Sequence, residues 1–220
     1  MLVLHGFAVS NYFNMVQLPL AVKELDYQTN LVYPNQSPEY LALSPMGKVP
    51  VLQTEFGVLT ETNVILEYLD TYASSQALYL GSAFEQAKVR ELVKICELYI
   101  ELPARRCHAE AFFGQPVDEL TKKEVKRALV KGVEALKRTA KFSPYLAGDK
   151  FSAADIVFLY SMELASAVGK RCFDMDLLAT LPVAKDLLEK LNQLPAVQKI
   201  TEERKAGNAE FKKYLASYKR

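Results

Sequence analysis

The sequence has few of the residues that stabilise secreted or metal-binding proteins. Its three cysteines are odd in number, far apart and not at metal-ligand spacing: Cys96, Cys107 and Cys172. This usage favours reduced thiols inside a cell over a disulfide framework. We therefore expect neither a structural disulfide nor a metal site.

An excess of charge of one sign is also missing, and so are long apolar runs. The formal net charge of the 220 residues is +1, which gives no general reason to expect a nucleic acid or an anionic membrane as partner. No apolar run approaches the length of a membrane span, and "MLVLHGFAVS" has no positive region before its apolar residues. The sequence predicts a soluble cytoplasmic protein with no nucleic-acid or membrane partner.

The residues that are present change in pattern near residue 75. Before this point, short β-like runs alternate with helical patterns. After residue 83 strand signals almost vanish, and apolar residues recur at helical spacing. We predict a small α/β domain at 1–76, a linker at 77–83 and an all-helical domain at 84–220.

The order of the expected elements in the first domain predicts its sheet. We expect strands at 2–5, 27–31, 51–53 and 57–59, and helices at 10–24 and 61–72. A strand–helix–strand unit followed by a hairpin predicts that parallel and antiparallel pairing mix in one small sheet.

One helix start in the second domain carries several signals at once. In "DKFSAADIVF", Ser152 is placed to cap the helix and Asp155 to reach back to it, with Phe151 and Ile156 as a hydrophobic staple. The following "IVFLYSMELASAV" is apolar nearly all round, which is typical of a core helix. The later "NAEFKKYLASYKR" is most simply a solvated helix with charged ends.

Pro50 lies at the start of a predicted strand, where it has no N–H to give to a sheet. A cis bond before it would turn the chain sharply and expose the backbone N–H and C=O of Val49, which can pair with an extended peptide. The alternative is an ordinary trans proline at a sheet edge, since only about 5–6% of X-Pro bonds are cis.

Two further helix starts in the first domain can also bind a ligand. A Thr62 hydroxyl at a helix N-terminus suits a carboxylate and Glu61 suits an ammonium, so together they suit an α-amino-acid end. The Ser10 hydroxyl lies at the start of the first predicted helix, after the first strand. There it can donate a hydrogen bond to a thiolate, and the positive end of the helix favours the negative charge. The alternatives are plain helix caps by Thr60 and by Ser10.

With these residues in place, a resemblance is evident. The stretch "NQSPEYLALSPMGKVPVLQTEFGVLTETNVILEYLD" resembles the glutathione-binding half of the cytosolic glutathione transferases, with Glu-Thr in place of the usual Glu-Ser. "KFSAADI" and "LPAVQKI" resemble segments of the family's helical domain. The resemblance implies a thioredoxin-like α/β N-terminal domain followed by an all-α helical bundle.

The resemblance also implies roles for individual residues. Ser10 falls at the catalytic serine of the serine-type, bacterial-like members, with assistance from Asn11 or Tyr12, whereas the basic residue usual two positions before Val16 is missing. The implied glutathione-binding residues are Asn35, Gln36, Lys48, Val49, Pro50, Glu61 and Thr62. Asn35 and Gln36 are neutral where some members carry a basic pair, so charge pairing with the glycyl carboxylate would depend on Lys48.

The implied activity is detoxification by glutathione transfer, with glutathione as co-substrate, no metal, and a small hydrophobic electrophile as second substrate. A homodimer through the long helices and the hairpin region is implied as well. The candidate residues for the second-substrate pocket are Arg106, Cys107, Phe112 and Phe113. For the aromatic residues, packing in a core is the stronger explanation.

Two other functions remain open for the same scaffold. One is glutathione-dependent reduction of peroxides or disulfides, assisted by Asn11. The other is a non-catalytic binding or regulatory protein, for which the neutral Asn35 and Gln36 leave room because they suggest weaker glutathione binding. The transferase class is also left open, because the zeta-class signature "SSCSWRV" is not reproduced.

Overall fold

The computed structural model describes the backbone of residues 1–218 and the side chains of residues 1–216. The chain forms two compact units. The first consists of Met1–Ala77 together with the segment from Asn192 onward, and the second is Leu78–Leu191. Among the described residues, no helix is both long and apolar enough for a membrane span.

The first unit contains a four-stranded sheet with the strand order β2-β1-β3-β4. The strands are β1 (Leu2–Gly6), β2 (Tyr27–Leu31), β3 (Val51–Thr54) and β4 (Gly57–Leu59). β1 pairs parallel with β2 and antiparallel with β3, and β3 pairs antiparallel with β4. The predicted mixture of parallel and antiparallel pairing is confirmed.

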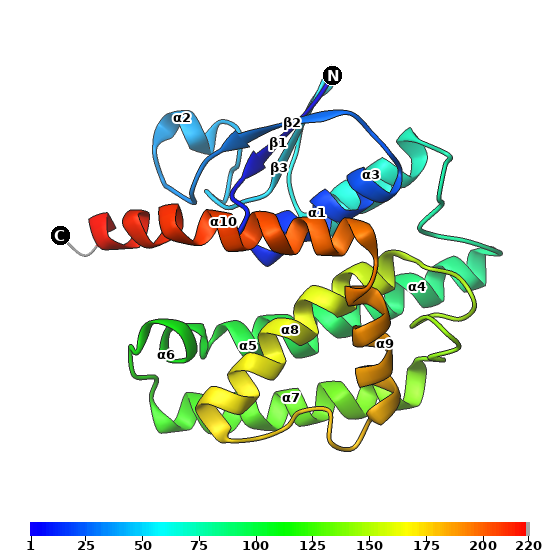
Figure 1. Cartoon of the computed structure of the whole chain (residues 1–220), viewed down its shortest axis with the longest axis vertical. Helices are drawn as coiled ribbons and strands as arrows, with labels where there is room; N and C mark the ends of the chain where they lie inside the picture. The colour runs from blue at the N-terminus through cyan, green and yellow to red at the C-terminus, as the bar shows by residue number, and fades with distance from the viewer. Residues whose placement is uncertain (219–220) are drawn as a thin grey trace. The chain divides into compact units, whose positions relative to one another are not determined.

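Two helices, α1 (Asn11–Val22) and α3 (Thr62–Tyr72), pack side by side against this sheet (Figure 1). The buried side chains that join the helices to the sheet form one apolar core, made of Leu2, Leu4, Phe13, Val16, Leu20, Leu52, Ile65 and Leu69. Burying such side chains is the main stabilising contribution to a fold of this size. The core fixes the N-terminal ends of α1 and α3 relative to the strands.

The first unit also contains two helices that frame the loops at one end of the sheet. The short α2 (Pro38–Leu41) follows β2, and the long α10 (Pro195–Tyr218) packs beside α1. The predicted helical domain of 84–220 differs here: the contacts of the segment from Asn192 to Tyr218 place it with the sheet, and residues 219–220 lie outside the described residues.

The second unit is helical throughout its regular elements. Its elements are α4 (Ala83–Cys96), a π-helical turn η1 (Glu97–Glu101), α5 (Leu102–Arg105), α6 (His108–Phe113), α7 (Glu119–Thr139), α8 (Ala153–Phe173) and α9 (Pro182–Asn192). α8 is the central helix of this unit, as its apolar sequence predicts, because fourteen of its residues are buried. The predicted fold class, a thioredoxin-like α/β domain with an all-α domain, is confirmed.

The cap of α8 is the one predicted in detail, and it is confirmed. The Ser152 N–H and hydroxyl both donate to Oδ2 of Asp155, each at 2.9 Å, and the N–H of Leu146 donates to Oδ1 at 2.8 Å. Asp155 is fully buried, and burial raises the pKa of its carboxyl to about 6 in spite of these donors. The cap is saturated and closed to solvent.

Candidate active site

The sheet brings the predicted site residues of the first unit to one edge. His5 near the end of β1 pairs with Val51 at the start of β3, and Leu59 at the end of β4 pairs with Leu52. The junction from β1 to α1, the start of β3 and the junction from β4 to α3 therefore lie together. The sequence order does not show this proximity, because it results from the antiparallel register.

Ser10 begins α1 as its N-cap residue. Its Oγ accepts a long 3.4 Å hydrogen bond from the N–H of Phe13, and its own N–H donates to the C=O of Phe7 at 3.0 Å. No acceptor for the Ser10 hydroxyl hydrogen is found among the described residues. The side chain is half-buried, so Ser10 caps the helix and still has a free donor. Asn11 and Tyr12 follow it in the first turn of α1.

Asn14 is a neighbour of Ser10 whose importance we did not recognise in the sequence. It lies one turn further along α1, four residues on, and therefore on the same face of the helix. Its side chain is fully buried, yet neither amide atom has a hydrogen-bond partner within the described part of the chain. A buried, unsatisfied amide is costly and is typical of a position with a role in binding or catalysis. The signal in the sequence was the missing basic residue at this position.

The bond between Val49 and Pro50 is cis, as expected from the resemblance rather than from the commoner trans geometry. The loop before it is held by side chains: the C=O of Lys48 accepts from the Tyr40 hydroxyl at 2.9 Å and from the Ser44 hydroxyl at 2.8 Å. Val49 itself is half-buried, and in the described network its backbone N–H and C=O have no backbone partner. Its peptide edge is free to pair with an extended ligand.

The start of α3 is unusual in its backbone. Glu61 is the N-cap residue and has φ +65°, in the region that only glycine adopts freely, and its exposed side chain makes no capping hydrogen bond. The alternative of a plain cap by Thr60 is therefore wrong. Thr62 is the first residue of the helix and is buried, with 7% of its surface exposed. Strain of this kind is concentrated at binding and catalytic sites.

The neutral pair Asn35 and Gln36 has local partners in the loop before α2. Asn35 donates from Nδ2 to the C=O of Tyr33 at 2.9 Å and accepts from the N–H of Ser37 at 3.1 Å. Gln36 donates to the C=O of Met46 at 3.4 Å. These hydrogen bonds hold the loop in shape. They also use some of the donors and acceptors with which the two side-chain amides could bind a ligand.

The helix α10 lies against this end of the sheet through aromatic rings. Tyr214 stacks on Tyr33 with ring centroids 3.8 Å apart, and Phe211 stacks on Phe7 at 5.1 Å. The Tyr214 hydroxyl also donates to the C=O of Pro34 at 3.2 Å. The expectation that this segment is simply solvated is therefore wrong: Phe211 and Tyr214 close one side of the loops that carry the site.

Further contacts of α10 reach the first turns of α1. A Cβ added to Gly207 would lie 3.3 Å from the Cβ of Ala8, so the helix passes close to the loop that leads to Ser10. Gln17 donates to Glu203. Through these contacts α10 packs against both the β1-to-α1 loop and α1 itself.

The predicted second-substrate residues lie in the helical unit and have separate environments. Arg106 pairs with Glu124 at 2.9 Å, and Cys107 is fully buried, which raises the pKa of its thiol to about 11. Cys107 is therefore an inert packed thiol here rather than an exposed pocket residue.

The two phenylalanines of this group are more accessible. Phe112 is 38% exposed, its ring lies 4.9 Å from that of His108, and the Arg171 guanidinium lies 4.6 Å from its centre. Phe113 is half-buried and lies edge-on to His108 at 5.2 Å. Burial and the nearby Arg105 lower the pKa of His108, which favours its neutral form.

Taken together, the sheet edge offers groups for both ends of a peptide-like ligand. The N-terminus of α3 and the Thr62 hydroxyl suit a carboxylate, Glu61 suits an ammonium, and Val49 suits a backbone amide. The free hydroxyl hydrogen of Ser10, at the positive end of α1, suits an anion such as a thiolate. In the described residues no cluster of three or more His, Cys, Asp or Glu side chains could hold a metal ion.

A thioredoxin-like sheet with a ligand edge of this kind, followed by a helical domain, defines a class of two-domain glutathione-binding proteins. The model of the glutathione S-transferase N-terminal domain matches residues 4–76, and that of the C-terminal domain matches residues 108–204. The chain belongs to the glutathione S-transferase family.

Relatives agree with this assignment. The chain is 48% identical over 220 residues to a glutathione S-transferase of Pseudomonas putida, and the match covers all of both chains. It is 26% identical to the maleylacetoacetate isomerase of Pseudomonas aeruginosa, over 70% of this chain and 76% of that one. Among solved structures, glutathione transferase F2 of Populus trichocarpa has a TM-score of 0.80 at 22% identity, covering 94% of this chain and 100% of that one. The last comparison concerns the fold alone.

Proposed function

We propose that the protein is a glutathione transferase that activates the thiol of glutathione at Ser10 for attack on small hydrophobic electrophiles. The observation that carries this proposal is the arrangement of incompletely capped helix starts, at Ser10 and Glu61, on either side of the free backbone edge of Val49. Both helix starts offer a positive field to a ligand with anionic groups, and the Ser10 hydroxyl adds a hydrogen-bond donor.

In this proposal glutathione binds extended along the sheet edge. Its cysteinyl part pairs with the backbone of Val49, beside the cis Pro50. Its γ-glutamyl ammonium meets Glu61, and its γ-glutamyl carboxylate meets Thr62 and the N-terminus of α3. Lys48, whose side chain is exposed, meets the glycyl carboxylate with support from Asn35 and Gln36.

The chemical step needs a thiolate at neutral pH. A free cysteine thiol has a pKa of about 8.5, and a donated hydrogen bond together with a helix N-terminus lowers it. The Ser10 hydroxyl would donate to the sulfur, Asn11 and Tyr12 would help to orient it, and the thiol proton would pass to solvent. The thiolate then forms a carbon–sulfur bond, and the leaving group departs with the electron pair of the bond that breaks. A preorganised donor of this kind is worth about 3–4 kcal/mol.

The quaternary state and location that we propose follow the family. The hairpin turn between β3 and β4 carries Phe56, which is 84% exposed, and Val64 and Tyr72 of α3 are exposed as well. Exposed apolar side chains on one unit support an interface between two copies of the chain. We infer a cytoplasmic homodimer that uses the hairpin region and the long helices.

Calorimetric titration with glutathione and with S-hexylglutathione tests the binding site. We expect micromolar to millimolar binding, and about tenfold weaker binding for Thr62→Ala, because a donor to the carboxylate is lost. Thr71→Ala is the matched control: it lies in the same helix, but its exposed hydroxyl donates to the C=O of Glu67 and Tyr68.

The outcomes separate the proposed activities. Absence of binding to the unaltered protein would overturn the glutathione site and favour a non-catalytic role. If glutathione binds, turnover with an aryl halide supports transfer, whereas turnover with hydroperoxides or disulfides alone would overturn it in favour of glutathione-dependent reduction. Equal weakening by both threonine variants would show that Thr62 acts only through the fold.

A further inference from the structure

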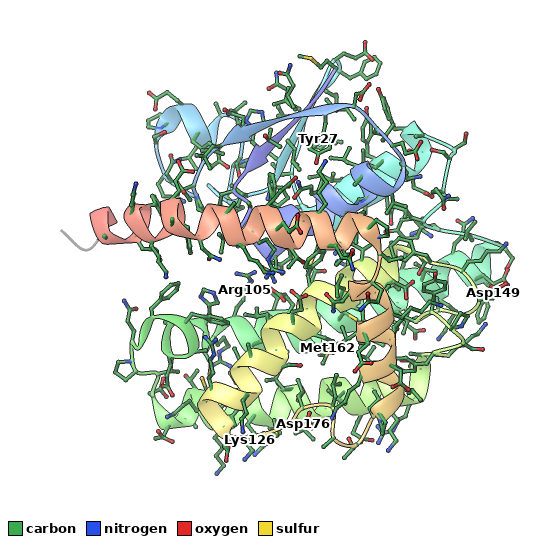
Figure 2. The ribbon with its side chains drawn as sticks, viewed as in Figure 1. Tyr27, Arg105, Lys126, Asp149, Met162 and Asp176 are labelled. Atoms are coloured by element: carbon green, nitrogen blue, oxygen red, sulfur yellow. The ribbon has the colours of Figure 1, made fainter. Side chains whose placement is uncertain are left out.

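A cavity lies within the helical unit, outside the proposed glutathione site. It has a volume of about 490 Å³ and is formed between the start of α4 and the loop that joins α7 to α8. Figure 2 labels Asp149 on this loop. The lining residues are Leu80, Gly81, Phe84, Glu85, Lys88, Val89, Lys141, Ser143, Ala147, Gly148, Asp149, Lys150 and Ser152. All of them belong to Leu78–Leu191, whereas Ser10 and the other residues of the proposed glutathione site belong to the first unit.

The walls of this cavity are held by hydrogen bonds of their own. In the loop, the N–H of Lys141 donates to the C=O of Leu146 at 2.9 Å, and the N–H of Tyr145 donates to the C=O of Gly148 at 2.9 Å. The loop is further tied to the saturated cap of α8 through the Leu146 N–H and Asp155. Such a loop pays little conformational entropy when a ligand binds, so the cavity is preformed.

The opposite wall is held by a second capping box. The N–H and hydroxyl of Ser82 donate to Oε2 of Glu85 at 2.7 and 2.8 Å, and the N–H of Glu85 bonds back to Ser82 at 3.3 Å. These bonds lower the pKa of Glu85, and Lys141 and Lys150 lower it further through their charge. The Glu85 carboxylate therefore caps α4, and the charges of Lys141 and Lys150 are felt at this wall of the cavity.

The cationic groups of the cavity differ in their partners. Lys88 forms an ion pair with Glu91. Lys141 and Lys150 have no ion-pair partner among the described side chains, and both are exposed. Two lysine ammonium groups at one cavity can be shared by an anion. Of the two acidic groups in the lining, Glu85 is committed to the cap of α4 and the other is Asp149.

The apolar surface of the cavity indicates what the anion carries. Phe84 lies in the first turn of α4 with 74% of its surface exposed, and Val89 below it is buried. An aromatic ring left open to solvent beside cationic groups suits a flat apolar ligand, since ring pairs stack in offset or edge-to-face geometry. Backbone and aliphatic surface from Gly81, Leu80 and Ala147 completes the apolar part.

We propose that this cavity binds an aromatic carboxylate, with its ring against Phe84 and its carboxylate shared by Lys141 and Lys150. Of the three lysines in the lining, Lys88 is paired with Glu91, and a single carboxylate can bridge the other two, Lys141 and Lys150. A volume of about 490 Å³ falls within the usual range for small-molecule sites, about 300–1,000 Å³, and accommodates a one- or two-ring acid.

Titration calorimetry with 1-naphthoate tests this site on the full chain. Titrations are run with and without saturating S-hexylglutathione, so that binding at the Ser10 site is recognised by competition. We expect saturable binding that persists with S-hexylglutathione, is at least tenfold weaker for the neutral 1-naphthalenemethanol, and is at least tenfold weaker in Lys141→Gln/Lys150→Gln. Phe84→Ala should weaken binding of both probes.

The control is the double variant Lys126→Gln/Lys137→Gln, which removes two exposed lysines of α7 outside the cavity. It should bind 1-naphthoate as the unaltered protein does. Absence of binding, loss of binding with S-hexylglutathione, equal affinity for the neutral alcohol, or equal weakening by both double variants would each overturn the proposal. Exposed lysine-to-glutamine changes preserve the fold, and an unchanged thermal unfolding midpoint verifies this.

Discussion

The helix starts at α8 and at α3 show two opposite uses of the same structural position. At α8, Asp155 accepts three hydrogen bonds from Ser152 and Leu146 and is fully buried. At α3, Glu61 has a left-handed backbone, an exposed side chain and no capping bond. The first start is capped by side chains of the chain itself, whereas the N-cap residue of the second makes no side-chain capping bond.

The comparison shows which helix starts contribute to the stability of the fold and which reduce it. A saturated cap contributes about 1 kcal/mol or more, and a non-glycine residue at positive φ costs about 1–3 kcal/mol. Ser10 lies between these extremes, since its cap bond is long and its hydroxyl hydrogen is free. Departures from the usual rules of helix capping are expected at functional sites. The incomplete caps of α1 and α3 therefore indicate the binding site, and the saturated cap of α8 indicates a structural role in the core.

The largest effect should come from removing the free donor at α1. Ser10→Ala should lower turnover about 100- to 1,000-fold because one preorganised donor to the thiolate is lost, while glutathione affinity changes little. Steady-state kinetics with calorimetry of glutathione binding measure both. Ser82→Ala, a cap serine of α4, is the control: it should reduce stability and leave turnover unchanged. Equal loss of turnover and affinity in Ser10→Ala would identify it as a cap only.

Removing the saturated cap should act on stability alone. Asp155→Ala leaves three buried donors without an acceptor and should lower the free energy of unfolding by about 3 kcal/mol. Chemical denaturation measures the change, and the exposed Asp149→Ala in the same region is the control. A change below about 1 kcal/mol would contradict the structural role that we assign to this carboxylate.

Replacing the strained residue at α3 should move stability and binding in opposite directions. Glu61→Gly relieves the positive φ and should raise the free energy of unfolding by about 1 kcal/mol. It also removes the carboxylate for the ligand ammonium and should weaken glutathione binding about tenfold. Chemical denaturation and calorimetric titration of one preparation measure both effects. If Glu61→Gly is less stable than the unaltered protein and binds glutathione equally well, the role that we assign to the start of α3 is wrong.

A further effect should be the pH dependence of the saturated cap. Burial raises the pKa of Asp155 from 3.8 to about 6, so the folded state favours the protonated acid. Its contribution to stability is complete below about pH 4 and is lost as the pH rises through about 6. The free energy of unfolding should therefore fall over this range, and Asp155→Asn should flatten that part of the profile. An unchanged slope in the variant would exclude Asp155 as its source.

Much of the fold was predictable because its signals are local. The strands at 27–31 and 57–59 have the predicted bounds, and the cap of α8 lies within four residues of sequence. Ser10, Val49 and Glu61 were recognisable from residue type and position, although their roles in binding and catalysis stay predictions. What brings them together is the antiparallel register of β1 with β3 and of β3 with β4.

Other features could not be predicted because they depend on distant contacts or on the backbone. The positive φ of Glu61 has no signature in a residue that is not glycine, and the unsatisfied amide of Asn14 depends on what surrounds it. Phe211 and Tyr214 have the pattern of a solvated helix in the sequence, because their partners Phe7 and Tyr33 lie more than 180 positions earlier.

The aromatic contact of α10 has a consequence for how the protein is made. Phe7 and Tyr33 leave the ribosome early, but Phe211 and Tyr214, which stack on them, follow only after Leu78–Leu191 has been translated. At about 5–20 residues per second this interval lasts several seconds. While the helical unit is leaving the ribosome, the rings of Phe7 and Tyr33 in the first unit therefore remain uncovered. The first unit is completed only after α10 has been translated.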